Sequence, residues 1–363
     1  MSKQDTQMIL DDADDIRRED KMNVVDATQL LYRQCEQAWS EARQIDLPSD
    51  YKDVTNVVVV GMGGSHLGAQ VIRALYRESL KVPLTIQSEY TPQGYVNENT
   101  LVLATSYSGN TEEPLSFVEL SKKAGAKIVC IASGGKLVDF AAKNSYPLYH
   151  FSSKHNPSAI PRYGAGYLFM SQMAYLSRLG FISLKDNEVR DVIDVLKNAN
   201  TRYDLEVPTS ENDAKQLAKK LKDTLVVLVS SEHLAGSAHI FKNQINESAK
   251  NFSTGFLIPE LDHHLLEGLT HPKKGKESMH FVFIESDLYH EKNSHRHKIT
   301  RDVVEKQGIG TSAYKPISNT KLTQAFETIA FTSNVALYLS ILNRVDPGPN
   351  PWVDYLKEQL AKF

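Results

Sequence analysis

The segment VVVVGMGGSHLGA, residues 57–69, joins an apolar run to a glycine-rich loop. Four successive valines are typical of a strand buried on both faces. Glycines allow a tight turn and a close approach of the backbone to a ligand, and the helix expected over Gly68 to Tyr76 would present free amides to an anion. A tight turn without ligand has the same pattern. The segment therefore predicts a strand–turn–helix unit and leaves open whether the turn binds anything.

A dinucleotide site is a weaker interpretation of this loop. Gly61 and Gly63 have the first spacing of the dinucleotide fingerprint, and Glu89 follows the next apolar run, where a ribose-binding acid would stand. However, His66 occupies the place of the third glycine, and Gly68 comes two residues late. A phosphate-bearing ligand of another kind is favoured.

Further short apolar runs follow, separated by helical patterns. In the first half we expect strands at Val57 to Val60, Leu84 to Ile86, Leu101 to Ala104 and Ile128 to Ala132. Helices are expected at Gly68 to Tyr76, Glu113 to Ala124 and Ala165 to Leu179. In the second half we expect strands at Leu225 to Val229, near Phe256 and at Phe281 to Ile284, and a helix at Ser237 to Ala249. Alternation of buried strands with helices predicts an α/β fold with parallel sheets, and the similar rhythm of the halves hints at an internal duplication.

The ends of the chain have their own patterns. The first twenty residues are rich in charge and are expected to be loosely ordered, before an amphipathic helix that ends ahead of Pro48. DPGPNP, residues 346–351, should break the preceding helix, and a closing helix starts at Trp352. The expected organisation is an N-terminal helical segment, two α/β subdomains and a C-terminal helix, with the bounds 1–48, 49–185, 186–345 and 346–363.

The second strand end carries three hydroxyl side chains. Leu101 to Ala104 is followed by TSYSGNTEE, which contains Ser106, Ser108 and Thr111 where a helix begins. Side-chain hydroxyls and free amides can converge there on a phosphate dianion at the carboxyl edge of the sheet. Helix capping would explain one hydroxyl but not three. The loop has no lysine and thus no Walker pattern, which argues against nucleotide triphosphates.

Composition limits the remaining possibilities. The 363 residues include 41 lysines and arginines against 44 acidic residues, so there is no general electrostatic drive toward nucleic acid or an anionic membrane. Two cysteines cannot form a disulfide framework, the N-terminus lacks a signal-peptide pattern, and no apolar run is expected to approach the roughly 20 residues that span a bilayer. We expect a protein of the cytoplasm that acts without nucleic acid or membrane.

Five segments together resemble one family. GMGGSHLGA and TSYSGNTEE are similar to the glycine and phosphate loops of sugar isomerase (SIS) domains. NPSAIPRYGAGYL, FKNQINESAK with PELDHH, and DPGPNPWVDYLK resemble, in order, segments of the bifunctional phosphoglucose/phosphomannose isomerases. The resemblance implies two SIS subdomains, a homodimer, and no cofactor or metal. It also implies isomerisation of glucose 6-phosphate by proton transfer through a cis-enediol, with mannose 6-phosphate as a further substrate to test.

The resemblance also implies roles for individual residues. Glu247 matches the base that moves the proton between neighbouring carbons, and Arg162 matches the arginine that stabilises the enediolate. His263, reaching the partner subunit's site, and Lys357 match the groups that assist ring opening. The loops would hold the sugar phosphate through these residues: Gly63, Gly64, Ser65, Ser106, Ser108 and Thr111.

The sequence leaves three points open. Asp262 stands where the family has asparagine, and the adjacent His264 leaves unsettled which histidine acts. At the position of Asn350, family members active on mannose 6-phosphate resemble one another in carrying threonine, whereas members active on glucose 6-phosphate alone carry glutamine. Asparagine matches neither, so the second substrate is undecided. The physiological direction of the reaction is also undetermined.

Other functions remain as alternatives. His290, His295 and His297 lie close together, but their spacing does not fit one helix face, and a solvated polar segment is favoured over a zinc site. A non-catalytic SIS sensor would need the hydroxyl loop but not all four proposed catalytic residues. An isomerase of another phosphosugar, such as an amino sugar or a ketopentose, fits the same motifs.

Overall fold

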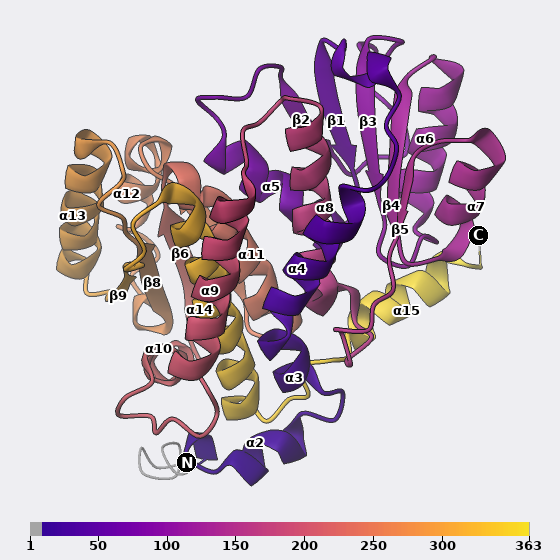
Figure 1. Ribbon diagram of the computed structural model, residues 1–363. Coiled ribbons are helices and arrows are strands. Elements are labelled where there is room, and N and C mark those ends of the chain that lie inside the picture. Colours follow the sequence, from indigo (N-terminus) through magenta and orange to yellow (C-terminus); the bar gives the residue numbers. More distant parts are fainter. Residues whose placement is uncertain (1–8, 363) are drawn as a thin grey trace.

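The computed structural model describes residues 9–362 and contains two parallel sheets flanked by helices (Figure 1). The first sheet has the strand order β2-β1-β3-β4-β5, and all its pairings are parallel. Its strands are β1 (Asn56–Val60), β2 (Leu84–Gln87), β3 (Thr100–Thr105), β4 (Lys127–Ala132) and β5 (Leu148–His150). All of them end at the same edge, which confirms the predicted α/β architecture.

The valine run of β1 is buried on both faces of the sheet because helices cover both. Val57 and Val59 pack into the core shared with α5 and α8, whereas Val58 and Val60 pack toward α6 and α7. These helices are α5 (Leu67–Leu75), α6 (Glu112–Lys123), α7 (Gly135–Asn144) and α8 (Ala165–Arg178). A continuous apolar strand is what burial on two faces requires.

The second sheet has the order β7-β6-β8-β9, again fully parallel. Its strands are β6 (Leu225–Ser230), β7 (Ser253–Leu257), β8 (Met279–Ile284) and β9 (Gly310–Tyr314). Its helices are α11 (Ala235–Glu247), α12 (Leu265–Gly268), α13 (Glu291–Lys306) and α14 (Lys321–Leu342), with α9 (Asp186–Arg202) and α10 (Asp213–Leu221) before the sheet. The order corresponds strand by strand to β2-β1-β3-β4, which supports the suggested duplication.

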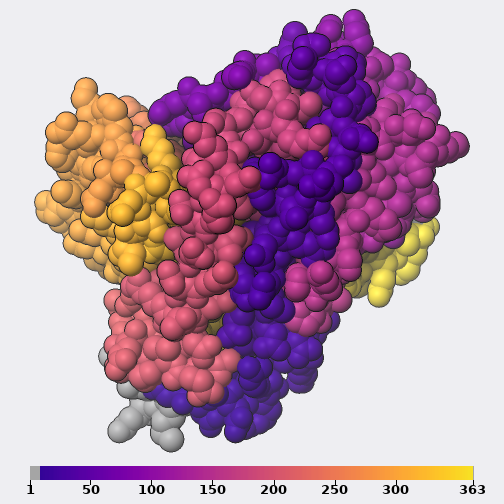
Figure 2. Space-filling view, viewed as in Figure 1, coloured from indigo at the N-terminus to yellow at the C-terminus, as the bar shows by residue number. Residues whose placement is uncertain are grey.

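One hydrophobic core runs through both halves. Helix α5 packs against α11, where a Cβ on Gly236 would lie 2.6 Å from Val71 Cα. Helix α4 (Leu31–Ala42) packs on α8 and α9 and crosses the front of the molecule between the two lobes (Figure 2). Because the core is continuous, the subdomain bounds of 49–185 and 186–345 stay a prediction.

The N-terminal region differs from expectation. Helices α2 (Ala13–Glu19) and α3 (Val24–Gln29) occupy it, and Asp12 caps α2 by accepting from Asp15 N at 3.1 Å. Ile16 is fully buried. The expected loose order is therefore wrong for this stretch, because one buried apolar side chain and a cap fix the helix. The first eight residues lie outside the described part of the chain.

The expectation that no long apolar segment exists is also wrong. Helix α14 has 22 residues and is long and apolar enough to cross a membrane by length and composition. It is completely buried between α9, α10 and α11, so it has the burial of a core helix. Helix α15 (Pro351–Leu360) follows the proline-rich break, as predicted, and is drawn at the outer edge of the molecule on the side of the first sheet (Figure 1).

Candidate active site

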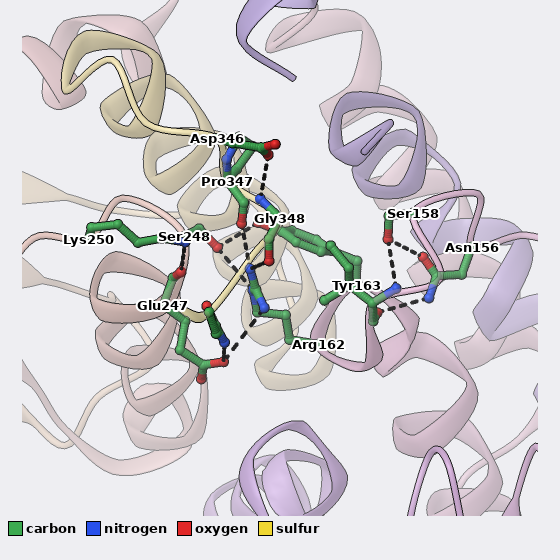
Figure 3. A network of polar contacts seen from close by, with 12 residues as sticks. Asn156, Ser158, Arg162, Tyr163, Glu247, Ser248, Lys250, Asp346, Pro347 and Gly348 are labelled. Carbon is green, nitrogen blue, oxygen red and sulfur yellow. Dashed lines mark hydrogen bonds and ion pairs between the residues drawn. The ribbon is translucent and has the colours of Figure 1, made fainter. Parts of the chain in front are cut away.

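Arg162 and Glu247, which are 85 positions apart in the sequence, lie face to face (Figure 3). Arg162 belongs to η3 (Pro161–Gly164), immediately before α8, and Glu247 is the last residue of α11. Arg162 Nη1 is 3.9 Å from Glu247 Oε2, too far for a hydrogen bond. That same Oε2 accepts from Asn350 Nδ2 at 3.2 Å. The second carboxylate oxygen is therefore available to other chemistry.

Arg162 is buried, 8% exposed, and its other donors are used. Its Nη2 donates to Pro347 O and to Gly348 O, the latter at 2.5 Å, and its Nε lies 3.4 Å from Ser248 Oγ. The two carbonyls belong to the linker between α14 and α15. The linker therefore contacts both Arg162 and, through Asn350, Glu247.

The end of α11 is held by several contacts. Lys250 Nζ donates to Glu247 O at 2.5 Å, Ser248 Oγ lies 2.5 Å from Tyr163 OH, and Asn343 Nδ2 donates to Ala249 O at 2.9 Å. The two donations from Lys250 and Asn343 satisfy free carbonyls at and just after the helix terminus. Desolvation and the charge of Arg162 lower the pKa of Lys250 to about 8. A cation with an unusual pKa thus adjoins the proposed base.

Ser106 and Thr111 come together at the carboxyl end of β3. Ser106 is fully buried, its Oγ donates to Thr111 Oγ1 at 3.1 Å, and it accepts from Gly109 N at 3.1 Å. Thr111 is the N-cap residue of α6, yet its side chain makes no capping bond. Ser108 Oγ instead accepts from Asn110 N at 3.3 Å. Capping therefore does not account for the Thr111 side chain, and the Ser108 hydroxyl binds a backbone amide of its own loop.

Gly109 gives this loop its shape. Its φ is +71°, and a Cβ there would lie 1.8 Å from Gly134 O. Asn110 Oδ1 accepts from Lys136 N at 3.1 Å, so the loop is fixed against the turn that follows β4. Only glycine combines this conformation with so close an approach.

The glycine loop joins the hydroxyl loop to the Arg162 segment. Gly63, with φ +51°, starts η2 (Gly63–His66), and a Cβ on Gly64 would lie 3.2 Å from Arg162 Cα. Ser65 Oγ accepts from Tyr107 N at 3.2 Å. A Cβ on Gly164 would lie only 2.1 Å from Tyr107 Cε2, so the Tyr107 ring packs directly against this glycine. The Ser65 hydroxyl therefore holds the two loops together, and its substrate-binding role stays a prediction.

His263 and Lys357 lie outside this network. His263, in η5 (Glu260–His263), is exposed on the α12 side, and Lys357 is exposed on α15 at the opposite flank (Figure 1). The Asp262 carboxylate accepts from Arg296 Nη1 at 2.9 Å and from Thr300 Oγ1 at 2.7 Å. His264 Nε2 lies 2.7 Å from Glu260 Oε2. In the described part of the chain, neither predicted ring-opening residue makes a hydrogen bond or an ion pair with Glu247.

The histidine cluster does not form a metal site within residues 9–362, where no group of three or more His, Cys, Asp or Glu side chains could hold a metal ion. The expectation of a solvated segment is nevertheless wrong for His297, which is 2% exposed. Its Nε2 lies 3.0 Å from Ser231 Oγ, and burial lowers its pKa to about 4. It is a core residue of α13.

Sequence reasoning missed several residues around the pair. Ser248, Lys250 and Tyr163 tie Glu247 to Arg162, and Thr28 and Gln244 line the same cavity. The sequence offered one weak signal: Gln244 and Lys250 each lie three positions from Glu247, within one helical turn or just beyond it. Thr28 had none, because tertiary packing alone brings α3 to α11.

Comparisons with known proteins agree with this fold. Residues 51–175 match the SIS domain model, and residues 210–360 match the model described as bacterial phospho-glucose isomerase C-terminal SIS domain. The chain superposes on a hypothetical protein from Thermus thermophilus with a TM-score of 0.73 and 15% identity, covering 99% of this chain and 94% of the other, which shows the fold alone. The protein is therefore of the sugar isomerase domain class.

Relatives narrow the class to a family. A bifunctional phosphoglucose/phosphomannose isomerase from Caldicellulosiruptor bescii is 32% identical over 92% of this chain and 97% of its own. A D-glucosamine-6-phosphate 4-epimerase from Sulfolobus acidocaldarius is 29% identical over 65% of this chain and 71% of its own. The chain belongs to the bifunctional phosphoglucose/phosphomannose isomerase family and is an isomerase.

Proposed function

We propose that the protein interconverts glucose 6-phosphate and fructose 6-phosphate, with mannose 6-phosphate as a second substrate. The observation that carries this proposal is the juxtaposition of Glu247 with Arg162, beside loops that bring Ser106 and Thr111 together. An aldose–ketose isomerase needs a base next to the carbons that exchange a proton and a fixed cation where the enediolate charge develops. The name of the C. bescii relative, bifunctional phosphoglucose/phosphomannose isomerase, supports the choice of both substrates.

Each step has a residue in this proposal. The phosphate is held by Ser106, Ser108, Thr111 and the amides at the start of α6, because a helix N-terminus and hydroxyls favour a dianion. Glu247 takes the proton from one carbon and returns it to its neighbour. Arg162, whose position is fixed by linker carbonyls, balances the negative charge on the enediolate oxygens. Lys357 and His263 serve ring opening.

Glu247→Gln tests the proposal. The amide keeps the shape of the side chain but cannot accept the proton, so we expect kcat to fall by about 1,000-fold while sugar phosphate still binds. Exchange of the C2 proton with solvent, followed by NMR in D2O with a chelator present, is the direct readout. The exposed Glu119, on α6, gives the control variant Glu119→Gln. Unchanged exchange in Glu247→Gln removes this residue from its role.

A substrate panel separates the alternatives. Turnover of an amino sugar phosphate in place of glucose 6-phosphate would move the protein toward the chemistry named for the S. acidocaldarius relative. Binding without turnover of any phosphosugar would favour a sensor. We further propose a homodimer in the cytoplasm; Cys35 and Cys130 are both buried and free, as is ordinary for a reducing compartment.

A further inference from the structure

A small cavity adjoins the proposed catalytic pair. Arg162, Tyr163 and Glu247 line it on one side. Most of the remaining wall is aliphatic and aromatic and comes from α3, α4, α5, α8, α11 and α14. The centre of a water molecule can occupy about 30 Å³ of it. This space is enough for one or two ordered water molecules.

Four polar side chains interrupt the apolar wall: Thr28, Asn243, Gln244 and Ser333. In two of them a buried polar atom has no hydrogen-bond partner among the described residues. Thr28, on α3, and Gln244, on α11, are each 9% exposed. Within residues 9–362, Thr28 Oγ1 and Gln244 Oε1 have no hydrogen-bond partner, although Gln244 Nε2 donates to Ser333 Oγ at 2.8 Å. Buried polar atoms are almost always hydrogen bonded, and each exception calls for a partner. Here both exceptions line one cavity.

A water molecule fits the dimensions and the chemistry. It needs about 10–15 Å³ and two to four polar neighbours. Thr28 Oγ1 and Gln244 Oε1 provide two, and Arg162, whose Nη1 is 3.9 Å from Glu247 Oε2, lines the same cavity. We propose that Thr28 and Gln244 hold a water molecule against the catalytic pair, and that this water exchanges the proton carried by Glu247. The second part rests on the proposed function.

The exchange leaves the chemistry of the reaction unchanged. After Glu247 has taken the C2 proton it is a neutral acid. Its O–H proton passes to the water oxygen while a proton of the water passes to a carboxyl oxygen, so both molecules are restored and no substrate bond changes. The isotope on Glu247 is replaced by one from solvent. The proton on Glu247 is thus either exchanged with solvent or returned directly to the sugar. The ratio of these two outcomes then depends on Thr28 and Gln244, which hold the water.

Crystallography tests the binding site independently of catalysis. At high resolution, the substrate-free wild-type protein should show a density peak about 2.6–3.2 Å from both Thr28 Oγ1 and Gln244 Oε1. A cavity without such a peak overturns the proposal. This result does not depend on which sugar phosphate the enzyme uses.

Isotope transfer tests the role. Thr28→Val keeps the shape and removes the hydroxyl, so for substrate deuterated at C2 the ratio of label transferred to label lost should rise, by up to about fivefold for one lost hydrogen bond. Thr332→Val is the matched control, because Thr332 is also buried but donates to Ile329 O at 3.2 Å and does not line the cavity. If Thr28→Val does not fold, Gln244→Met is the substitute variant, and the same rise in the ratio is expected. An unchanged ratio in a folded variant overturns the role, whereas absence of isomerisation in the wild type would count against the proposed function instead.

Discussion

Arg162 contacts two parts of the chain that are remote in sequence, the end of α11 and the linker, and also its neighbour Tyr163. Its Nη2 reaches two linker carbonyls, its Nε reaches Ser248, and its guanidinium lies 5.0 Å from the centroid of the Tyr163 ring. A planar group with five donors can make these contacts at once, whereas an ammonium group cannot. The position of the cation is therefore set before substrate binds.

Lys250 gives a pH-dependent prediction. Lys250 is exposed as a whole residue, but desolvation of its amine and the charge of Arg162 lower its pKa from 10.5 to about 8. Below about pH 8 the amine is charged in both states, and the folded protein bears the cost of holding that charge. Between about pH 8 and 10.5 the unfolded chain binds the extra proton, so this group's contribution to stability rises with pH.

Lys250→Met removes that cost. We expect the variant to have a larger free energy of unfolding than the wild type below pH 8, and this difference to shrink toward pH 10.5. Urea unfolding at several pH values measures this difference, and Lys143→Met, at an exposed lysine of α7, is the control. A difference that does not vary between pH 7 and 10.5 would show that Lys250 titrates normally.

At the scale of elements, the α5–α11 crossing depends on Gly236. A methyl group there would meet Val71 Cα at 2.6 Å and Gln70 O at 2.7 Å, which are backbone atoms that cannot move aside. We expect Gly236→Ala to destabilise the protein by about 1–3 kcal/mol. Gly268→Ala, on α12, meets nothing within 4 Å and should change stability by less than about 1 kcal/mol. Thermal unfolding of the two variants makes the comparison.

Helix α15 contributes exposed surface rather than core. It has no buried residue, and Trp352 is 82% exposed. A chain ending at Asn350 keeps the linker that contacts Arg162 and Glu247 but lacks Lys357. We expect its Tm to lie within about 2 °C of wild type while isomerase activity is lost. Calorimetry together with a coupled assay tests this, and full-length Lys357→Ala is the control. A large fall in Tm would mean that α15 packs against a partner subunit.

The elements that the sequence predicted and those that it missed differ in burial. The strands with continuous apolar runs, such as β1 and β3, were found because both faces are buried. The edge strands β5 and β9 were missed, since LYH is short and GTSAY has few apolar residues. The other two edge strands, β2 and β7, were predicted, so an edge position weakens the apolar pattern without always removing it.

At the scale of the whole molecule, the two halves repeat a topology but not a site. By strand order, β8 takes the place of β3, yet the segment after β8 carries Glu285 and Asp287 instead of the Ser106 loop. These acids pair with Arg301 at 3.0 Å and with Lys315 at 2.5 Å. Among the described residues, the second sheet therefore does not repeat the hydroxyl loop that we propose as the phosphate site.

Subunit mixing tests the proposed homodimer. His263 lies outside the Glu247 network of its own chain, so in our proposal it completes the partner's site. His263→Ala and Glu247→Gln dimers should each be inactive, but hybrids formed from an equal mixture contain one intact site. We expect recovery of about a quarter of wild-type activity after random exchange. A mixture that stays inactive, with hybrid formation confirmed by mass spectrometry, would place both residues in the same chain's site.

The sequence by itself determined the fold class and indicated the Ser106 loop as a candidate phosphate site. A valine run before glycines, and hydroxyls after a buried strand, are local patterns whose physical meaning depends on backbone conformation and on burial of nearby residues. The family resemblance added Glu247 and Arg162 as candidates. The tertiary structure decided that these two side chains meet, that the linker holds both, and that Thr28 joins Gln244 in one cavity. Such contacts join positions far apart in the chain, and packing of separate helices, rather than any local preference, brings them together.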